Sequence, residues 1–575
     1  MVKWNLNDIY SLEERESLIF NLKSNVDSFK EIRKTLSNDL SPEEFMRVLK
    51  KREELHALSS RLISFARLWQ SENTLDSKRN AHESIISELC ARAYNDLLFF
   101  ALWFKDLDEE KAKKLIQFSG KYHYYLERLR AFKKFTLEEK EEQIISLEDL
   151  SGKEALVRLY GIFTDSFVFD WNGKQLTLDE ISAFKQSPER EKRKASYDLV
   201  LEKYGKEQSV LGELYQDMVN NWRNENMVLR GFSSPISVRN FSNDVPDESV
   251  NVLLSIVKKN TGLFKEYFSL KSLLLGLKMD RYDWYAPFEK EEKEFSFEES
   301  KKMVLEAYKE FSPELSGLAE KIFDESHVHA FPEKGKRSGA FCYSVLNTIT
   351  PYVFLNHTGK IRDVFAMAHE LGHGVHSLLA KDQTNFTFHS TLPLSETASV
   401  FGELLLSKSL LKNASKEEKI AVLVRNLDDQ YASITRQAFF VLFEIQAHDA
   451  ISKGASAEKL NELYIQNIRE QFGNMFIPDV FKHEWKYISH FYYSPFYCYA
   501  YAFGNLLVLS LYKQYQEEGE SFIPKYLKLL SYGGSESPQT ILNELGIDIT
   551  QEAFWQKGFD LIREELEELK KLVGN

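Results

Sequence analysis

The chain has 575 residues, of which 43% are hydrophobic and 28% charged, enough apolar sequence to bury a large core over several domains. The formal net charge of −13 argues against nucleic acid as a partner. Cys90, Cys342 and Cys498 lie far apart and indicate no disulfide framework. The N-terminus lacks an apolar signal core, and there is no apolar run of about 18 residues, so we expect a cytoplasmic protein without a membrane partner.

Residues 1–180 are predicted to form an N-terminal helical region, because apolar residues near the start recur at helical spacing. The exception is FVFDWNGKQLTL (167–178), where Asn172-Gly173 predicts a tight hairpin turn. We place a domain boundary there and expect a second domain over 181–575. No Pro- or Ser-rich linker separates the two, so continuous packing is expected.

A short sheet is predicted within 338–358, where SGAFCYSV and TPYVFLNHT are rich in β-branched and aromatic residues. An extended peptide can add itself as a strand to such an edge through main-chain hydrogen bonds. The small residues at its start leave space for close backbone approach, and the candidate binding residues are Gly339, Ala340 and Phe341. A hairpin that only supports the following helix is an equally good interpretation.

The most specific motif is His369-Glu370-Leu371-Gly372-His373, within a segment (361–379) whose apolar spacing predicts a helix. Residues at i and i+4 lie on one helix face about a turn apart, so both imidazoles can bind one metal ion. Glu370 can then take a proton from metal-bound water without being a ligand. A helix with two surface histidines is the alternative, but a chance H-E-x-x-H is expected only roughly 0.03 times in such a chain.

Two other residues of this helix invite interpretation. Gly372 in mid-helix costs roughly 1 kcal/mol relative to alanine, which is easiest to explain if something packs closely on that side. His376 follows His373 by three residues. We interpret His376 as a supporting or structural histidine, because two turns of one helix cannot comfortably supply three ligands to one ion.

Zinc fits the pair of imidazoles of His369 and His373. A catalytic zinc needs a third protein ligand and keeps one position open for water. The next predicted helix, 392–411, carries Glu396 and Glu403 seven residues apart on one face. Carboxylates on a face that packs against another helix are costly unless a metal or cation compensates them. Glu396 is therefore the candidate ligand and Glu403 the candidate to orient a ligating histidine. Alternatively, Glu396 is a first-turn glutamate favoured by the helix dipole.

HELGHGVHS followed by LPLSETASVFGE resembles the M3 family of zinc metallopeptidases, specifically its oligoendopeptidase F branch. Four further segments resemble that branch in the same order, namely 336–370, 435–444, 490–504 and 531–548. The resemblance implies a mainly α, zincin-like fold with a small β-sheet beside the zinc helix and a deep substrate channel. Residues 181–575 would then be the catalytic domain and 1–180 an oligoendopeptidase F-type helical region.

The resemblance also implies an activity, which is the hydrolysis of internal peptide bonds in short oligopeptides. It implies one Zn²⁺ per chain, held by His369, His373 and Glu396, with Glu370 as general base. Short peptides are the expected partners, and no oligomeric state is predicted.

The segment 490–501, HFYYSPFYCYAY, gathers one histidine and five tyrosines. Imidazole and phenol donors aimed at a developing oxyanion lower the barrier to acyl transfer. The resembled family takes such donors from this segment, which implies His490 here. Aligning the segment on its tyrosines favours Tyr497 or Tyr499 as the second donor. Aromatic-rich helices are usually core, so a packing role is expected for the other tyrosines.

Two other functions compete with an endopeptidase. A zinc carboxypeptidase on a related helical scaffold also uses H-E-x-x-H, but needs a cation for the substrate C-terminus, for which Arg436 is a conceivable anchor. A binding protein with an inactive metal site would have lost Glu370 or a ligand, and neither is missing from this sequence.

Overall fold

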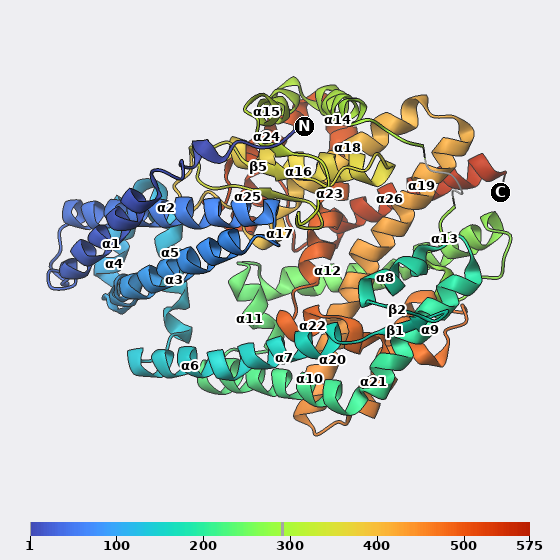
Figure 1. The fold of residues 1–575 in the computed structure, drawn as a ribbon, viewed down its shortest axis with the longest axis horizontal. Helices are drawn as coiled ribbons and strands as arrows, with labels where there is room; N and C mark the ends of the chain where they lie inside the picture. The colour runs from blue at the N-terminus through green and yellow to red at the C-terminus, as the bar shows by residue number, and fades with distance from the viewer. Residues whose placement is uncertain (1, 289–292, 575) are drawn as a thin grey trace. The chain divides into compact units, whose positions relative to one another are not determined.

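The computed structural model describes residues 2–288 and 293–574, which are helical over most of their length (Figure 1). Contacts divide the chain into two compact units of three segments each. Unit 1 comprises Met1–Lys134, Glu292–Leu410 and Glu517–Gly546, and unit 2 comprises Phe135–Glu291, Leu411–Gln516 and Ile547–Asn575. Each unit is therefore assembled from segments distant in sequence, which differs from the single boundary expected near residue 180.

Unit 1 combines the N-terminal helices with the helices around the H-E-x-x-H motif. Its N-terminal helices are α1 (Arg15–Ile32), α2 (Pro42–Glu72), α3 (Ser77–Asp106), α4 (Glu109–Phe118) and α5 (His123–Ala131). Its later helices are α14 (Phe297–Phe311), α15 (Pro313–Asp324), α16 (Ile361–Leu379), α17 (Leu392–Ser395), α18 (Thr397–Asn413), α24 (Ile523–Ser531) and α25 (Pro538–Glu544). Helix α18 runs on past the end of its unit 1 segment at Leu410.

The predicted sheet is present and contacts the helix that carries the motif. Strand β4 (Phe341–Tyr343) pairs antiparallel with β5 (Tyr352–Phe354), as the sequence predicts. A third strand, β3 (Val328–His329), pairs parallel with β5. The order β3-β5-β4 leaves β4 at an edge, and both β4 and β5 contact α16.

The N-terminal helices and this sheet share one hydrophobic core. Helices α1, α2 and α3 lie side by side (Figure 1), with Phe45 of α2 stacked near Phe100 and Phe104 of α3. The indole of Trp4 packs against Phe341, Tyr352 and Phe354 of the two paired strands. The N-terminal segment therefore supports the sheet beside α16 directly, in line with the continuous packing expected from the sequence.

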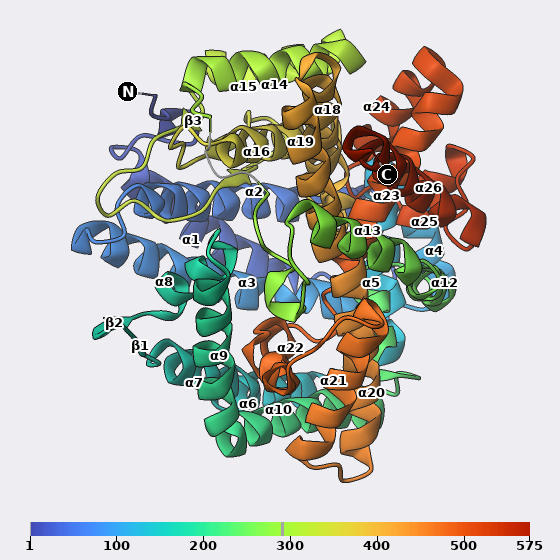
Figure 2. The same cartoon turned by 90° about the vertical axis from the view of Figure 1, so that its right-hand side faces the viewer.

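Unit 2 is a second helical body. Its earlier helices are α6 (Glu139–Ser151), α7 (Lys153–Asp165), α8 (Leu178–Ala183), α9 (Arg190–Lys206), α10 (Gln208–Arg223), α11 (Pro235–Ser242), α12 (Asp247–Lys259) and α13 (Thr261–Leu274). Its later helices are α19 (Lys416–Gln430), α20 (Arg436–Ser452), α21 (Ala457–Phe472), α22 (His490–Tyr493), α23 (Tyr499–Glu518) and α26 (Glu552–Val573). Figure 2 shows α20 beside α21, which it contacts.

The predicted hairpin is confirmed in unit 2. Strands β1 (Phe169–Trp171) and β2 (Lys174–Leu176) pair antiparallel around Asn172 and Gly173. Both turn residues have positive φ (55° and 81°), the conformation that makes Asn-Gly favourable in a two-residue hairpin turn. Among the residues that the structure describes, no helix is long and apolar enough to cross a membrane.

Candidate functional site

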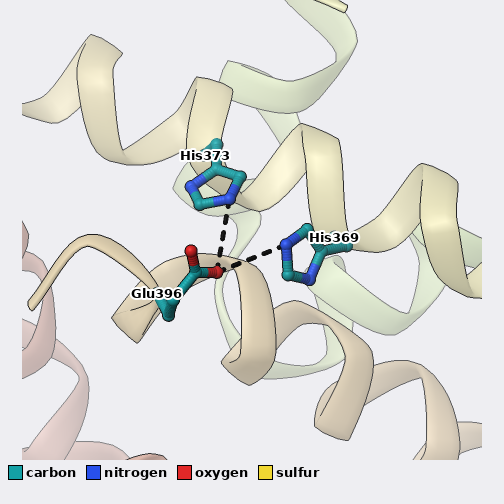
Figure 3. Close-up of side chains that lie close together, drawn as sticks. All are labelled: His369, His373 and Glu396. Atoms are coloured by element: carbon teal, nitrogen blue, oxygen red, sulfur yellow. Dashed lines mark ion pairs between the residues drawn. The ribbon is translucent and has the colours of Figure 1, made fainter. Parts of the chain in front are cut away.

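Helix α16 presents His369 and His373 one turn apart, with their ring centroids 4.9 Å apart. The Nε2 atoms of both rings face the same oxygen, Oε2 of Glu396, at 3.3 and 3.4 Å (Figure 3). Over residues 2–288 and 293–574, these three side chains form the one histidine, cysteine or carboxylate group that could hold a metal ion. The structure therefore brings together the three ligands expected from the sequence.

Glu396 lies at a break in the predicted second helix, between the short α17 and the long α18. Its Oε2 also accepts a hydrogen bond from Ser399 Oγ at 2.7 Å, which fixes the carboxylate. Two turns further on, Glu403 Oε1 lies 2.5 Å from Nδ1 of His369. Glu403 thus holds the far nitrogen of His369 and directs Nε2 toward Glu396, the arrangement that orients metal-bound histidines.

The ionisation of these groups is strongly coupled. Burial alone would lower the pKa of His369, but its hydrogen bonds to Glu396 and Glu403 hold this pKa well above the ordinary value. Burial would likewise raise the pKa of Glu396, but its hydrogen bonds to the two imidazoles hold it far below the usual range. Positive charge is therefore favoured beside Glu396, and a bound cation satisfies the same requirement.

Glu370 lies beside this group on α16, with 7% of its surface exposed. Burial raises the pKa of its carboxyl group, against the lowering effect of His369 and His373 and of a hydrogen bond from the Cys342 backbone. Helix α16 and strand β4 together therefore orient this carboxylate. A buried carboxylate with a raised pKa is suited to accept and release protons near neutral pH.

A cavity of about 500 Å³ opens beside Glu370 and His373. Its other lining residues come from β4 and its flanks, from α16 and from the chain between α16 and α18, namely Ala340, Phe341, Cys342, Tyr343, Ser344, His376, Ser377, Phe388, His389, Ser390 and Ser395. Gly339 adjoins this wall, has φ of +82° and leaves open space where a Cβ atom would stand. His376 is buried, and burial lowers its pKa to about 3, so it lines the cavity as a neutral imidazole.

Helices α16 and α18 approach unusually closely at Gly372. A Cβ atom added there would lie 2.5 Å from the Ala398 carbonyl oxygen and 2.6 Å from Ser399 Cα. Gly402 of α18 has a similar role, because a Cβ there would lie 2.1 Å from the Tyr308 hydroxyl and 3.0 Å from the Ala368 carbonyl oxygen. The close packing expected around Gly372 is therefore present, and its partner is the backbone of α18, which begins directly after Glu396 and carries Glu403.

Replacement of Gly372 by alanine is expected to weaken metal binding by at least about tenfold, because α18 must move and take Glu396 and Glu403 with it. Metal affinity by chelator competition and the melting temperature measure this effect. The matched control is Gly374→Ala, whose added Cβ meets mainly the end of the Ile322 side chain. Equal metal affinity in the two variants would contradict the explanation.

The segment from α22 to the first turn of α23 places three polar side chains together in unit 2. The rings of His490 and Tyr497 are nearly parallel, with centroids 5.7 Å apart, and Tyr501 packs edge-on against both. The Tyr501 hydroxyl lies 3.5 Å from His490 Nε2. Burial lowers the pKa of His490, and the charge of Arg436 lowers it further, so the imidazole is neutral at neutral pH. We call His490, Tyr497 and Tyr501 the donor cluster.

The other tyrosines of the segment lie outside the donor cluster. Tyr499 is fully buried, and its hydroxyl accepts a hydrogen bond from Asn243 Nδ2 at 2.7 Å. Tyr492 is fully buried and donates to the Leu211 carbonyl, whereas Tyr493 is half exposed. Of the two tyrosines favoured by the sequence, Tyr497 therefore lies with His490 and Tyr499 does not.

Arg436, the conceivable anchor for a substrate carboxylate, is engaged within unit 2. Its Nη2 lies 3.3 Å from Glu484 Oε1, and its guanidinium lies over the rings of Trp284 and Phe440. Arg281 shares the same carboxylate of Glu484. These contacts give Arg436 a structural role within unit 2.

Two contacts, one in each unit, carry no recognisable sequence signal. Tyr308 of α14 donates to the Ala368 carbonyl at 2.5 Å and so fixes the helix backbone next to His369. Tyr308 lies 60 residues before Ala368 in the chain, in an ordinary amphipathic stretch. Tyr501 is one of five tyrosines within twelve residues, and only the turn between α22 and α23 places its ring beside His490.

Comparison with known proteins supports the same class. The model of peptidase family M3 matches residues 183–561, and the Oligopeptidase F model matches residues 103–169. An oligoendopeptidase F homologue of Borreliella burgdorferi is 28% identical over 99% of this chain and 98% of its own. Oligopeptidase PepF of Bacillus subtilis is 24% identical over 99% of this chain and 87% of its own.

Solved structures share the whole fold. A crystal structure from Chlamydophila abortus superposes with a TM-score of 0.88 at 26% identity, covering 99% of this chain and 98% of that one. Oligoendopeptidase-F from Enterococcus faecium gives a TM-score of 0.73 at 20% identity over 98% and 99% of the two chains, which shows a common fold.

The helical fold, the H-E-x-x-H helix with its facing glutamate and these matches define a metalloendopeptidase. The chain belongs to peptidase family M3, since the family model covers well over half of it. The two family models meet between residues 169 and 183, near the boundary proposed from the sequence, whereas the compact units of the fold divide the chain elsewhere.

Proposed function

We propose that this protein is a zinc-dependent endopeptidase that hydrolyses internal bonds of short oligopeptides, with Glu370 as its general base. The observation that carries the proposal is the convergence of His369 Nε2, His373 Nε2 and Glu396 Oε2 beside the buried carboxylate of Glu370. His369, Glu370 and His373 lie on α16, and Glu396 directly precedes α18, which packs backbone to backbone against α16. Such packing favours a precise catalytic geometry.

The three converging atoms fit Zn²⁺, because two imidazoles and one carboxylate are a common ligand set of catalytic zinc. When bound, zinc would polarise the scissile carbonyl and lower the pKa of a water ligand. His369 and His373 would hold the ion through Nε2, and Glu403 would keep His369 in the required tautomer. Glu370 is adjacent to His369 in sequence but is not one of the three converging residues. It would accept the proton of the attacking water and pass it to the leaving amine.

Substrate binding is assigned to the edge strand β4 and the cavity beside it. The edge of a sheet recognises peptide backbone through main-chain hydrogen bonds, largely independently of sequence. Ala340 and Phe341 line the cavity, and Gly339 leaves open space at the start of the strand. Apart from Glu370, the cavity is lined mainly by aromatic, hydroxyl and imidazole groups, which suit an uncharged side chain of the substrate.

We assign the stabilisation of the oxyanion to His490 and Tyr497. The support for this assignment is the donor cluster itself, in which a neutral imidazole and two phenols lie together and remain partly exposed. Tyr499 is assigned a structural role, because its hydroxyl is buried and bonded to Asn243. Short peptides are the proposed partners, and the cytoplasmic location stays a prediction.

Digestion of a mixed peptide pool, followed by mass spectrometry, tests the activity. We expect cleavage at internal bonds of peptides of roughly 5–20 residues, the range that a concave site can enclose, and no cleavage of folded globular proteins. Peptides amidated at the C-terminus should be cut as well as free ones. Cleavage restricted to free C-termini would indicate the carboxypeptidase instead, and rapid digestion of folded proteins would contradict the size limit.

Removal of the metal is expected to abolish this activity, and stoichiometric Zn²⁺ should restore it. Co²⁺ or Mn²⁺ could also restore activity in vitro. Reloading should become weaker as the pH falls, because the metal must displace the proton that the raised pKa of His369 retains. Elemental analysis and activity during chelator titration measure both effects. Full activity after exhaustive chelation, with no metal detected, would rule out the zinc site.

A further inference from the structure

The turn between α22 and α23, residues 494–498, is held in a strained conformation. Phe496 has φ of +58°, a left-handed conformation that is costly for a bulky residue and is maintained only by strong surrounding contacts. Its ring is fully buried and packs against His448, with centroids 4.6 Å apart. Tyr497, the tyrosine stacked on His490, is the next residue in the chain.

Two ionisable side chains, the buried Glu444 and the half-buried Arg239, hold this turn. The backbone N–H of Phe496 donates to Oε1 of Glu444 at 2.8 Å, and Glu444 is 1% exposed. On the other side, Arg239 of α11 donates through Nε to the Pro495 carbonyl at 3.1 Å and through Nη2 to Ser494 Oγ at 2.9 Å. Three consecutive residues of the turn, 494–496, are thus each bonded to Glu444 or Arg239 on a neighbouring helix.

Burying the Glu444 carboxyl group costs free energy, and within the described part of the chain its one hydrogen bond comes from the Phe496 N–H group. Its second oxygen, Oε2, has no hydrogen-bond partner among the described residues. Burial raises the pKa of Glu444 to about 8, against a lowering by the Phe496 hydrogen bond and by Arg239, so the carboxyl group is largely protonated at neutral pH. Tyr215 and Cys498 also lie near this carboxyl group. A buried acid with one partner, placed under a strained residue, indicates a positioning role.

We propose that Glu444, with Arg239, is a positioning residue that fixes the 494–497 turn and thereby holds Tyr497 stacked on His490 in the donor cluster. Only the catalytic consequence of this inference rests on the proposed function. The structural claim, that Glu444 determines where the Tyr497 ring lies, does not depend on the proposed function. Neither Glu444 nor Arg239 belongs to the donor cluster itself.

The test compares Glu444→Met with Glu444→Gln in the full-length zinc-loaded protein. Methionine cannot accept the Phe496 hydrogen bond, so we expect kcat to fall about tenfold or more with KM and zinc content nearly unchanged. Glutamine keeps an acceptor oxygen and resembles the protonated acid, so activity within about threefold of wild type is expected. Glu565→Met is the control, since Glu565 is an equally buried carboxylate of this unit that accepts a hydrogen bond from Gln430.

A double-mutant cycle separates positioning from general destabilisation. Tyr497→Phe alone should lower kcat about 10²-fold, the usual cost of one oxyanion donor. Adding Glu444→Met should cost little more, because the hydroxyl that Glu444 positions is already gone. Fully additive losses would overturn the inference. Should Glu444→Met fail to fold, Arg239→Met removes the other two bonds to the turn and is expected to give the same pattern.

Histidine NMR provides a readout that does not depend on catalysis. The Hε1 resonance of His490, assigned with His490→Gln, senses the ring current of the stacked Tyr497. We expect Glu444→Met to shift this resonance and Glu565→Met to leave it in place. An unshifted resonance with unchanged kcat would overturn the inference and leave the proposed function standing. A shifted resonance, together with full activity of Tyr497→Phe, would support the positioning role and reject Tyr497 as the donor.

Discussion

Glu370→Gln is expected to retain its zinc and its fold and to lose about 10²–10⁴-fold in kcat, the usual contribution of a positioned acid or base. The side chain lies beside the three converging ligand atoms without being one of them, so metal binding does not depend on it. The glutamine carbonyl can still accept the hydrogen bond from the Cys342 backbone, so the local structure should persist. Steady-state kinetics with an internally cleaved peptide, and elemental analysis of the same preparation, measure the two properties.

Glu370→Asp is the matched comparison, because it keeps a carboxylate but withdraws it by one methylene group. We expect a loss of kcat intermediate between wild type and glutamine, since proton transfer is sensitive to the distance of the base. If Glu370→Gln lost its zinc, Glu370 would have to be a ligand and the proposed division of roles would be wrong.

The convergence of His369, His373 and Glu396 could be predicted from the sequence because its determinants are local. The i, i+4 spacing of His369 and His373 becomes a shared face as soon as the segment is helical. Although the helix is broken at Glu396, the side chains of Glu396 and Glu403 both contact His369, as their seven-residue spacing predicts. Gly372 could be interpreted for the same reason, since a mid-helix glycine is destabilising and is easiest to explain by close packing.

The division of the chain into units could not be predicted in the same way. Each unit combines three distant segments, and the contacts that join them, such as Trp4 with Phe341 and Phe354, are ordinary aromatic packing without a periodic signature. The third strand, β3, has only two residues, too few to show alternation. Sequence patterns report which face of an element is apolar, but not which distant element covers it.

The donor cluster lies between these two cases. Its segment was recognisable from the density of aromatic residues, but the selection among tyrosines depends on the turn at Phe496. A left-handed φ at a phenylalanine has no sequence signal, since glycine or asparagine is expected at such a position. The structure places Tyr497 with His490, whereas Tyr499 is buried and bonded to Asn243.

Glu396→Gln is expected to weaken zinc binding by more than about 10²-fold, because it removes the anionic ligand on which both histidines converge. Glu403→Gln is the matched comparison on the same helix face. It keeps a hydrogen-bond acceptor for His369 Nδ1 and should cost at most about 10–100-fold, as typical for a residue that only orients a ligand.

Chelator competition at fixed pH measures both affinities, and the melting temperatures of the metal-free proteins serve as the control for folding. The metal-free Glu396→Gln protein should remain folded, while the pKa of His369 falls, because one of the hydrogen bonds that raise it is lost. Proton NMR of the histidine rings would detect that fall. If Glu396→Gln kept both zinc and activity while Glu403→Gln lost them, Glu403 would be the third ligand and the orienting role would pass to Glu396.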